Sequence, residues 1–237
     1  MDISSSGSGP PRLGQESTQT AEHSGAAVPR ALLIRTSIIC FLAWVFSVYD
    51  YVLFGTLLPQ IAKSFGWSTA TSTLVATWVT VGTFFVSIAV GPMLDHIGRR
   101  ITLTITTAGA AITSGLTGFT FSAIYLIVVR AFSGLGYSEE VVNTVYLNEI
   151  YGSHTRRGFM YSFVQSGWPV GALLSALVSA LLLSSIGWRG VFLFAVFPAV
   201  VIVVLTRRLP ESPTFVNITR VRRLRAEGRA DEAVALA

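Results

Sequence analysis

Three long stretches of the chain, residues 64–94, 101–129 and 158–188, contain no Asp, Glu, Lys or Arg. Each exceeds the roughly 20 residues that an α-helix needs to cross about 30 Å of hydrocarbon. A helix of a soluble protein rarely runs so far without charge, because one of its faces normally meets water. The composition agrees, since 51% of the 237 residues are hydrophobic and 12% are charged, against about 25% charged in soluble domains. The chain is therefore expected to lie in a lipid bilayer.

Glycines, prolines and charged clusters divide the apolar sequence into six candidate spans. Their expected bounds are residues 36–59, 72–93, 101–121, 123–147, 159–184 and 190–206. Helices are expected because each satisfies its own backbone hydrogen bonds in lipid, whereas a barrel would show alternating strands of about ten residues. We therefore predict an all-α, polytopic membrane protein with six transmembrane helices.

The expected transmembrane domain covers residues 32–206. Before it, residues 1–31 are rich in Ser, Gly, Pro and Thr and lack the apolar core of a signal peptide, so they are predicted to form a disordered cytoplasmic tail. After it, residues 207–237 are predicted to begin a cytoplasmic connector.

Basic residues gather at alternate ends of the expected spans. Arginine pairs at 99–100, 156–157 and 207–208 fall on one side together with the stretch RVRRLRAEGR, whereas Lys63 and Arg189 fall on the other. Because basic loops stay in the cytoplasm, we expect an integral, multi-pass protein of the cell membrane with both termini cytoplasmic. The same rule accounts for the basic stretch, so no nucleic-acid partner is predicted.

The sequence contains no motif that is typical of an enzyme. There is no nucleotide-binding loop and no cluster of metal ligands, since His23, His96 and His154 are scattered through the tail and loops. The single cysteine, Cys40, lies in the first span and cannot form an intrachain disulfide. We therefore predict a protein that is not an enzyme and uses no metal or other cofactor.

The stretch GPMLDHIGRR connects the second and third expected spans. Arg99 and Arg100 are expected to hold this connection in the cytoplasm, and Gly91 and Gly98 permit a tight reversal. Asp95 lies near the N-terminus of the third span, where the helix dipole favours an anion.

This connection resembles the hallmark loop of the major facilitator superfamily, Gly-x-x-x-Asp-(Arg)-x-Gly-Arg-Arg, in which His96 here replaces the usual Arg. RAFSGLGYSEE resembles the fourth-span motif of that family, with Arg130 followed by an acid ten residues later at Glu140. NEIYGSHTRRG resembles the loop after the fourth span, in which Glu149 precedes Arg156.

Two further stretches resemble particular branches of this superfamily. GWRGVFLFAVFPA followed by RRLPESPTF is similar to the sixth span and exit of sugar and metabolite proton symporters. SVYDYVLFGTLLPQIAKSFGWS is similar to the first span of the organic-acid and sialic-acid branches, with Ser47 where those relatives often carry Asp. The resemblance covers about residues 32–230.

The resemblance implies half of a twelve-helix fold, built as two inverted three-helix repeats. It implies transport of a small metabolite, an organic acid or a sugar, by proton-coupled symport and alternating access. A lone half has no opposing wall, so the expected partners are a missing C-terminal six-helix half or a second copy, besides substrate, protons and the lipid bilayer. The other interpretation is a truncated or accessory membrane protein without independent transport activity.

Asp50 and Arg130 carry the expected chemistry, because an unpaired ionisable group inside the membrane costs at least ~2.5 kcal/mol. At 1.5 Å per residue, Asp50 should lie roughly 9 Å and Arg130 roughly 10 Å from the outer boundary. Both lie on the first helix of a repeat, which lines the central cavity in this fold. We expect Arg130 to bind a substrate carboxylate and Asp50 to carry a proton or act as its counter-ion. A purely structural ion pair is the alternative.

Further candidates surround this pair. Tyr49 and Phe54 could wall a binding site, although aromatic residues also anchor spans at the interface. Gln165 could present a polar group to substrate from the fifth span, although the ordinary tolerance of transmembrane helices for a kink explains it equally well. Glu140 is the second candidate for proton coupling, whereas Glu139 is expected to contact a neighbouring span or interfacial polar groups.

The predicted gating network lies at the cytoplasmic face. Glu149 is expected to pair there with nearby arginines and to lock one transport state. Its predicted members are Gly91, Asp95, Gly98, Arg99, Arg100, Glu149 and Arg156. Simple surface solvation is the alternative for Glu149.

Overall fold

The computed structural model describes residues 29–152 and 156–236, which are helical throughout most of their length and contain no strand. Its helices are α1 Arg30–Phe65, α2 Thr69–Ile88, α3 Val90–Ile97, α4 Arg99–Gly118, α5 Ala123–Ala131, α6 Gly134–Tyr137, α7 Glu139–Tyr151, α8 Arg157–Gln165, α9 Gly167–Thr206, α10 Pro213–Ala226 and α11 Ala230–Ala235. The predicted all-α fold is confirmed. Of the predicted tail, residues 1–28 lie outside the described residues.

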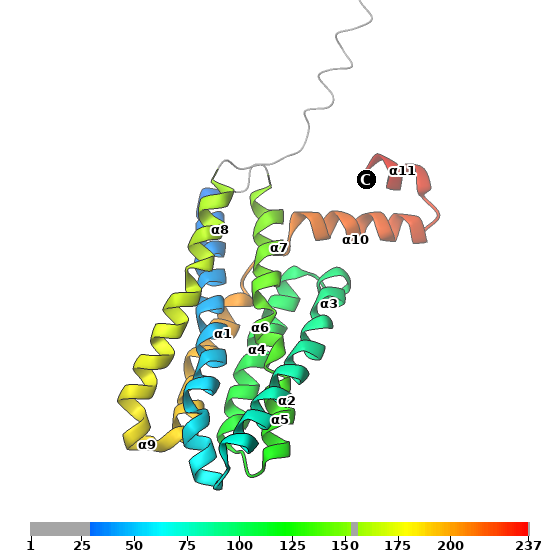
Figure 1. Cartoon of the computed structure of the whole chain (residues 1–237). Coiled ribbons are helices and arrows are strands. Elements are labelled where there is room, and N and C mark those ends of the chain that lie inside the picture. The colour runs from blue at the N-terminus through cyan, green and yellow to red at the C-terminus, as the bar shows by residue number, and fades with distance from the viewer. Residues whose placement is uncertain (1–28, 153–155, 237) are drawn as a thin grey trace, which may run out of the picture.

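These helices make six passages along one bundle (Figure 1). The first is α1, the second α2 with α3, the third α4, and the fourth α5, α6 and α7 in succession. The fifth passage is α8 with the first part of α9, and the sixth is the rest of α9. The chain reverses inside α9 at Gly187, whose φ of 66° and ψ of 172° are not helical and are accessible to glycine without strain.

Local sequence determines where the first two passages end and begin. Gly66 closes α1 in the left-handed conformation, with φ 65°, as glycine commonly does after a helix. The Ser68 hydroxyl then accepts a hydrogen bond from the Thr71 amide and caps α2. Helix α1 extends beyond the expected span 36–59 at both ends. Helix α2 begins before the expected span 72–93 and ends inside it at Ile88, and α3 continues the second passage to Ile97.

By length and apolar character alone, three described segments could cross a membrane: Arg30–Phe65, Thr69–Ile97 and Arg157–Thr206. The last of these contains two passages. The third passage is rich in Thr and Gly, and the fourth is divided into short helices. These two passages are therefore recognised as spans by their place in the bundle and not by hydropathy.

Small residues bring the fifth passage against α1. Gly167, Gly171, Ser175 and Ser179 are all buried, as expected for a packing stripe of this spacing. A Cβ atom on Gly171 would lie 2.5 Å from the Val45 carbonyl oxygen. No larger side chain fits there without moving a helix.

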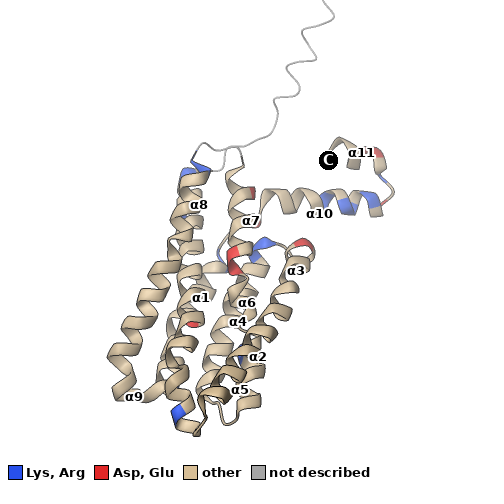
Figure 2. Cartoon of the chain, viewed as in Figure 1, with Lys and Arg blue, Asp and Glu red and all other residues tan. Residues whose placement is uncertain are grey.

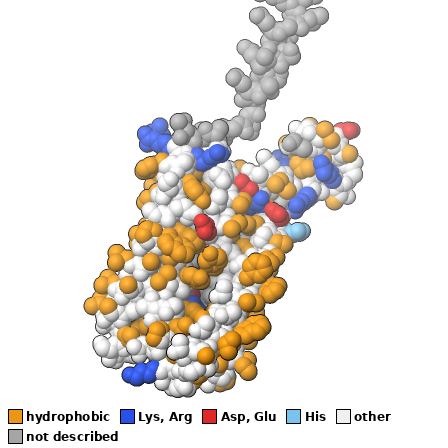
Figure 3. All heavy atoms as spheres, in the orientation of Figure 1, with side chains coloured by type: hydrophobic (Ala, Val, Ile, Leu, Met, Phe, Trp, Pro, Cys, Tyr) orange, Lys and Arg blue, Asp and Glu red, His pale blue; other side chains and the backbone are white. Residues whose placement is uncertain are grey.

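The surface of the bundle is strongly apolar between two polar ends. Large side chains such as Trp78, Phe85, Ile124 and Phe197 are exposed, and Figure 3 shows hydrophobic side chains spread over the bundle. Arginines gather toward the end of the bundle that carries α3, the start of α8 and α10 (Figure 2). Such a surface suits a hydrocarbon layer with basic residues on one side.

The segment after α9 forms a short helical connector. The Ser212 hydroxyl accepts a hydrogen bond from the Phe215 amide at 3.0 Å, and Pro213 starts α10. Figure 1 shows α10 and α11 extending sideways from one end of the bundle. At the end of α10, a hydrogen bond from Arg223 lowers the pKa of the exposed Glu227 carboxyl group.

Candidate functional site

Asp50 of α1 and Arg130 of α5 form a buried ion pair in the middle of the bundle. Arg130 Nη1 donates to both carboxylate oxygens of Asp50, at 3.2 and 3.1 Å, and Nη2 donates to the Asp50 carbonyl oxygen at 3.0 Å. The exposed fraction is 1% for Arg130 and 2% for Asp50. The structure thus brings together the two residues that the sequence placed at equal depth.

Local structure holds Arg130 in place. It lies in the last turn of α5, where the helix dipole favours a cation. The Ser133 hydroxyl donates to the Arg130 carbonyl oxygen at 2.6 Å, and the Thr83 hydroxyl donates to the same oxygen at 3.4 Å. The guanidinium carbon lies 5.0 Å from the ring centroid of Phe54 and 5.5 Å from that of Phe192, within the range of cation–π attraction.

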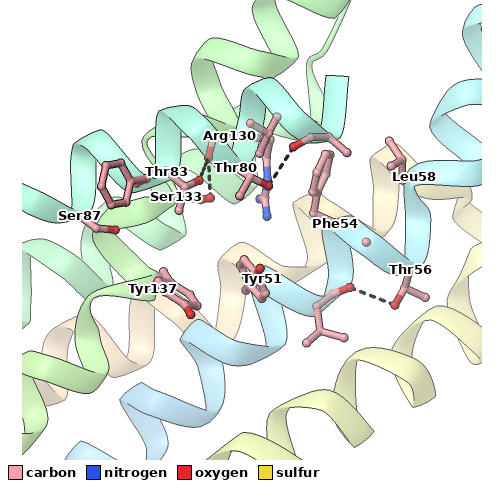
Figure 4. Close-up of a pocket in the computed structure, with 15 residues that line it drawn as sticks. Tyr51, Phe54, Thr56, Leu58, Thr80, Thr83, Ser87, Arg130, Ser133 and Tyr137 are labelled. Carbon is pink, nitrogen blue, oxygen red and sulfur yellow. Dashed lines mark hydrogen bonds between the residues drawn. The ribbon is translucent and has the colours of Figure 1, made fainter. Parts of the chain in front are cut away.

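A cavity of about 740 Å³ opens beside this pair, between α1, α2, α5 and α6. Arg130 lines the cavity, and Asp50 lies behind it. The other polar lining residues are Thr56, Thr80, Thr83, Ser87 and Ser133, and the aromatic ones are Tyr51, Phe54, Phe84 and Tyr137. Figure 4 shows Arg130 among the side chains of Tyr51, Phe54, Thr80 and Thr83. A cationic group, hydroxyls and aromatic rings thus converge on one space.

The two aromatic candidates of α1 lie in different places. Phe54 lines the cavity with Arg130. Tyr49 is buried on another side of α1, beside Phe46 at 5.8 Å between ring centroids, and lines a separate apolar cavity with Leu174 and Phe197. The residue that reaches the Arg130 cavity is instead Tyr51, because successive residues on a helix point about 100° apart.

Glu140 and Gln165 lie together and are not part of the lining of the Arg130 cavity. Gln165 Nε2 donates to Glu140 Oε1 at 2.8 Å, and Glu140 is exposed. Glu140 lines a smaller cavity of about 160 Å³ with Ser87, Gly91 and Tyr137. Gln165, predicted to bind substrate, therefore bonds to Glu140, predicted to couple protons, in this conformation.

Arg99 contacts two other candidates for the gating network, Asp95 and Glu149. Its Nη2 lies 2.8 Å from Glu149 Oε1 and 3.8 Å from the Asp95 carboxylate. Its Nη1 donates to the Leu94 carbonyl oxygen at 2.8 Å. Gly98 has φ 105°, so the reversal before α4 requires glycine.

The remaining predicted members are Arg100, Gly91 and Arg156. Arg100 donates from Nη1 to the Leu209 carbonyl oxygen at 3.4 Å. Gly91 lies within α3 and is exposed, so the reversal occurs at Gly98 alone. Arg156 is exposed at the start of α8.

Comparison with known proteins identifies the family of this chain. The family model described as Major Facilitator Superfamily matches residues 40–229. The chain belongs to the major facilitator superfamily. Its relatives are transporters and not enzymes.

Two curated relatives and one solved structure illustrate the similarity. A putative metabolite transport protein of Haemophilus influenzae is 32% identical over 167 residues, covering 70% of this chain and 41% of the relative. A probable 4-methylmuconolactone transporter of Cupriavidus pinatubonensis is 28% identical, covering 79% and 45%. The inward open xylose transporter XylE of E. coli matches with a TM-score of 0.69 at 20% identity, covering 86% and 55%, which shows the fold. The chain thus spans less than half the length of these curated relatives.

Glu211 is a residue of this superfamily chain that the sequence analysis missed. Its Oε1 accepts hydrogen bonds from the backbone amides of Arg99, Arg100 and Ser212, at 2.9, 3.1 and 3.1 Å. The anion at the N-terminus of α4 is therefore Glu211, and the predicted Asp95 carboxylate is 66% exposed. The signal available was the Glu directly before the Ser-Pro cap of α10.

Ser212 links Glu211 to Glu149. Its hydroxyl donates to Glu149 Oε2 and also caps α10. Arg99 stacks on Phe215 of α10, 5.2 Å from its ring centroid. The hallmark loop of the superfamily, the end of the fourth passage and the connector are thus joined in one polar cluster.

Proposed function

We propose that this chain is the N-terminal six-helix half of a proton-coupled transporter for a small carboxylate. The observation that carries the proposal is the Asp50–Arg130 pair beside the 740 Å³ cavity. A buried arginine that faces a cavity is a natural contact for a carboxylate, because its planar group donates two parallel hydrogen bonds.

An aromatic monocarboxylate fits this cavity best. Tyr51, Phe54, Phe84 and Tyr137 offer rings for stacking, and neighbouring hydroxyls offer hydrogen bonds to ring substituents. Similar proteins are named a benzoate transport protein and a niacin transporter of Acinetobacter baylyi and a gallate transporter of Pseudomonas putida. We propose the same class of substrate for this chain.

Proton coupling follows from competition for Arg130. While Asp50 is ionised, its carboxylate occupies Nη1 of Arg130. Protonation of Asp50 removes the charge of this competitor, so a substrate carboxylate can take its place beside the guanidinium group. Release of the proton then favours return of Asp50 and departure of the substrate.

The wider assembly is part of the proposal. Exposed apolar faces on α2 and α9 are available to lipid and to an opposing six-helix half, supplied by a further part of the protein or by a second copy. The basic end with α3, α8 and α10 is proposed to face the cytoplasm, which places both termini there. An uptake assay separates the possible assemblies. Uptake by this chain alone would indicate a homodimer, and uptake only with a separately expressed second half would indicate a split transporter. Uptake in neither case would indicate an accessory protein.

Arg130→Lys tests the proposed substrate contact. Lys keeps the charge and loses the planar fork, so uptake or binding of benzoate should weaken about tenfold while that of a neutral aromatic amide changes little. Arg189→Lys is the matched control, since Arg189 lies outside the cavity on the Trp188 ring. Equal losses for the charged and the neutral compound would contradict a carboxylate-binding role.

A further inference from the structure

Glu139 is a buried acid that the transport scheme above does not use. Its exposed fraction is 0%. The Ser47 hydroxyl of α1 donates to Oε2, and the Thr107 hydroxyl of α4 faces the same carboxyl group. Oε1 has no hydrogen-bond partner among the described residues. The contacts of this acid are therefore neutral hydroxyl groups.

No cation compensates Glu139 in the described part of the chain. The ion pairs there do not include it, because Arg130 is held by Asp50 and Arg99 by Glu149. The backbone amides of Val141 and Val142 bond to the Ser138 carbonyl oxygen. These two amides in the first turn of α7 are therefore not available to a charged carboxylate.

The neighbouring elements add no charge either. The titratable side chain beside Glu139 on α1 is the Cys40 thiol, and α4 presents Thr107. From α8, Gln165 approaches the adjacent acid Glu140. The acid Glu140 is exposed, so it differs from Glu139 in access to solvent.

Tight packing keeps solvent away from Glu139. A Cβ atom on Gly136 would lie 2.8 Å from the Ala110 side chain, and one on Gly109 would lie 2.7 Å from Leu135. The cavities near the Asp50–Arg130 pair and near Glu140 do not include Glu139 in their lining. A carboxylate in such surroundings loses its hydration without gaining a counter-charge, which strongly favours the neutral acid.

We propose that Glu139 is a second proton-binding site, occupied by a proton in this conformation and separate from the Asp50–Arg130 pair. Ser138 and Glu140, the residues on either side of it, line the 160 Å³ cavity. The fourth passage is interrupted at Ser138, between α6 and α7. A change in angle at this break brings Glu139 to the cavity, where its proton passes to water and the carboxylate becomes hydrated.

Infrared spectroscopy of the full chain in lipid nanodiscs tests the protonation directly, and this readout does not depend on transport. At neutral pH the wild type should show the carbonyl stretch of a protonated carboxylic acid. Glu139→Gln should abolish this band, whereas the matched control Glu140→Gln should keep it. Glu139→Asp should shift the band, which keeps the assignment testable should the Gln variant fold poorly. A band that survives in Glu139→Gln, or is absent from the wild type, would overturn the proposal.

The use of this proton in transport rests on the proposed function and needs a second measurement. In proteoliposomes containing the complete transporter, Glu139→Gln should lower the number of protons moved per benzoate. Uptake with an unchanged ratio would overturn a role in coupling. Absence of uptake in every variant would instead count against the proposed function and would leave the infrared result intact.

Discussion

The guanidinium group of Arg130 is held on its edge by Asp50 and on its faces by Phe54 and Phe192. Burial of two charges is costly, and the attraction between them offsets that cost only with good geometry and further hydrogen bonds. Arg130 Nε has no hydrogen-bond partner in the described residues. One donor of the guanidinium group is therefore unused in this conformation.

Charge removal should reveal how strongly this pair depends on both partners. Arg130→Gln leaves the Asp50 carboxylate buried without a counter-charge, so it should lower the free energy of unfolding at neutral pH by about 3 kcal/mol or more. The double variant Asp50→Asn with Arg130→Gln removes both charges and should be the more stable of the two. Chemical unfolding of the full chain in detergent measures the difference. A double variant less stable than the single one would contradict a net electrostatic pair.

For individual residues, the sequence predicted the features that depend on depth along a helix. Asp50 and Arg130 are each the only charged residue in their part of a span, so their heights could be calculated. The contacts of Glu139 with Ser47 and of Glu211 with the start of α4 depend on how distant helices pack. No spacing within one segment contains that information.

The distances between helices are constrained by glycines at the places where two backbones approach closely. A Cβ atom added to Gly171 would lie 2.5 Å from the Val45 carbonyl oxygen, and one added to Gly134 would lie 2.5 Å from the Thr83 carbonyl oxygen. These glycines fix the distance of the fifth passage from α1 and of the fourth passage from α2. The stripe in the fifth passage was predictable from its four-residue spacing. The breaks at residues 132–133 and 138 were not, because no proline marks them.

Substitution of Gly171 tests this close approach. Gly171→Ala should destabilise the bundle by about 1–3 kcal/mol, because the added methyl group forces α1 and α9 apart. Gly158→Ala is the matched control, since no atom lies within 4 Å of a Cβ atom there, and the helix propensity of Ala should make it neutral or slightly stabilising. Thermal unfolding of both variants in the same detergent gives the comparison. Equal melting temperatures would show that the contact at Gly171 is not tight.

Over the whole molecule, six passages and their grouping follow from the charge-free segments and the loops between them. The position of the proposed opposing half cannot be predicted from the sequence, because a surface that meets such a half and a surface that meets lipid would both be apolar. Exposed Trp78 and Phe84 on the second passage and Phe197 on the sixth illustrate this. The Arg130 cavity lies on the same side as Phe84, which contributes to its lining. An opposing half placed there would close the cavity.

Accumulation of benzoate in proteoliposomes under an imposed proton gradient tests the central claim, that Asp50 couples proton and substrate at Arg130. The complete transporter should accumulate benzoate in its wild-type form. Asp50→Asn should still exchange internal for external benzoate and should no longer concentrate it, because Asn neither binds nor releases a proton. Accumulation by Asp50→Asn with the same dependence on pH as the wild type would contradict the account.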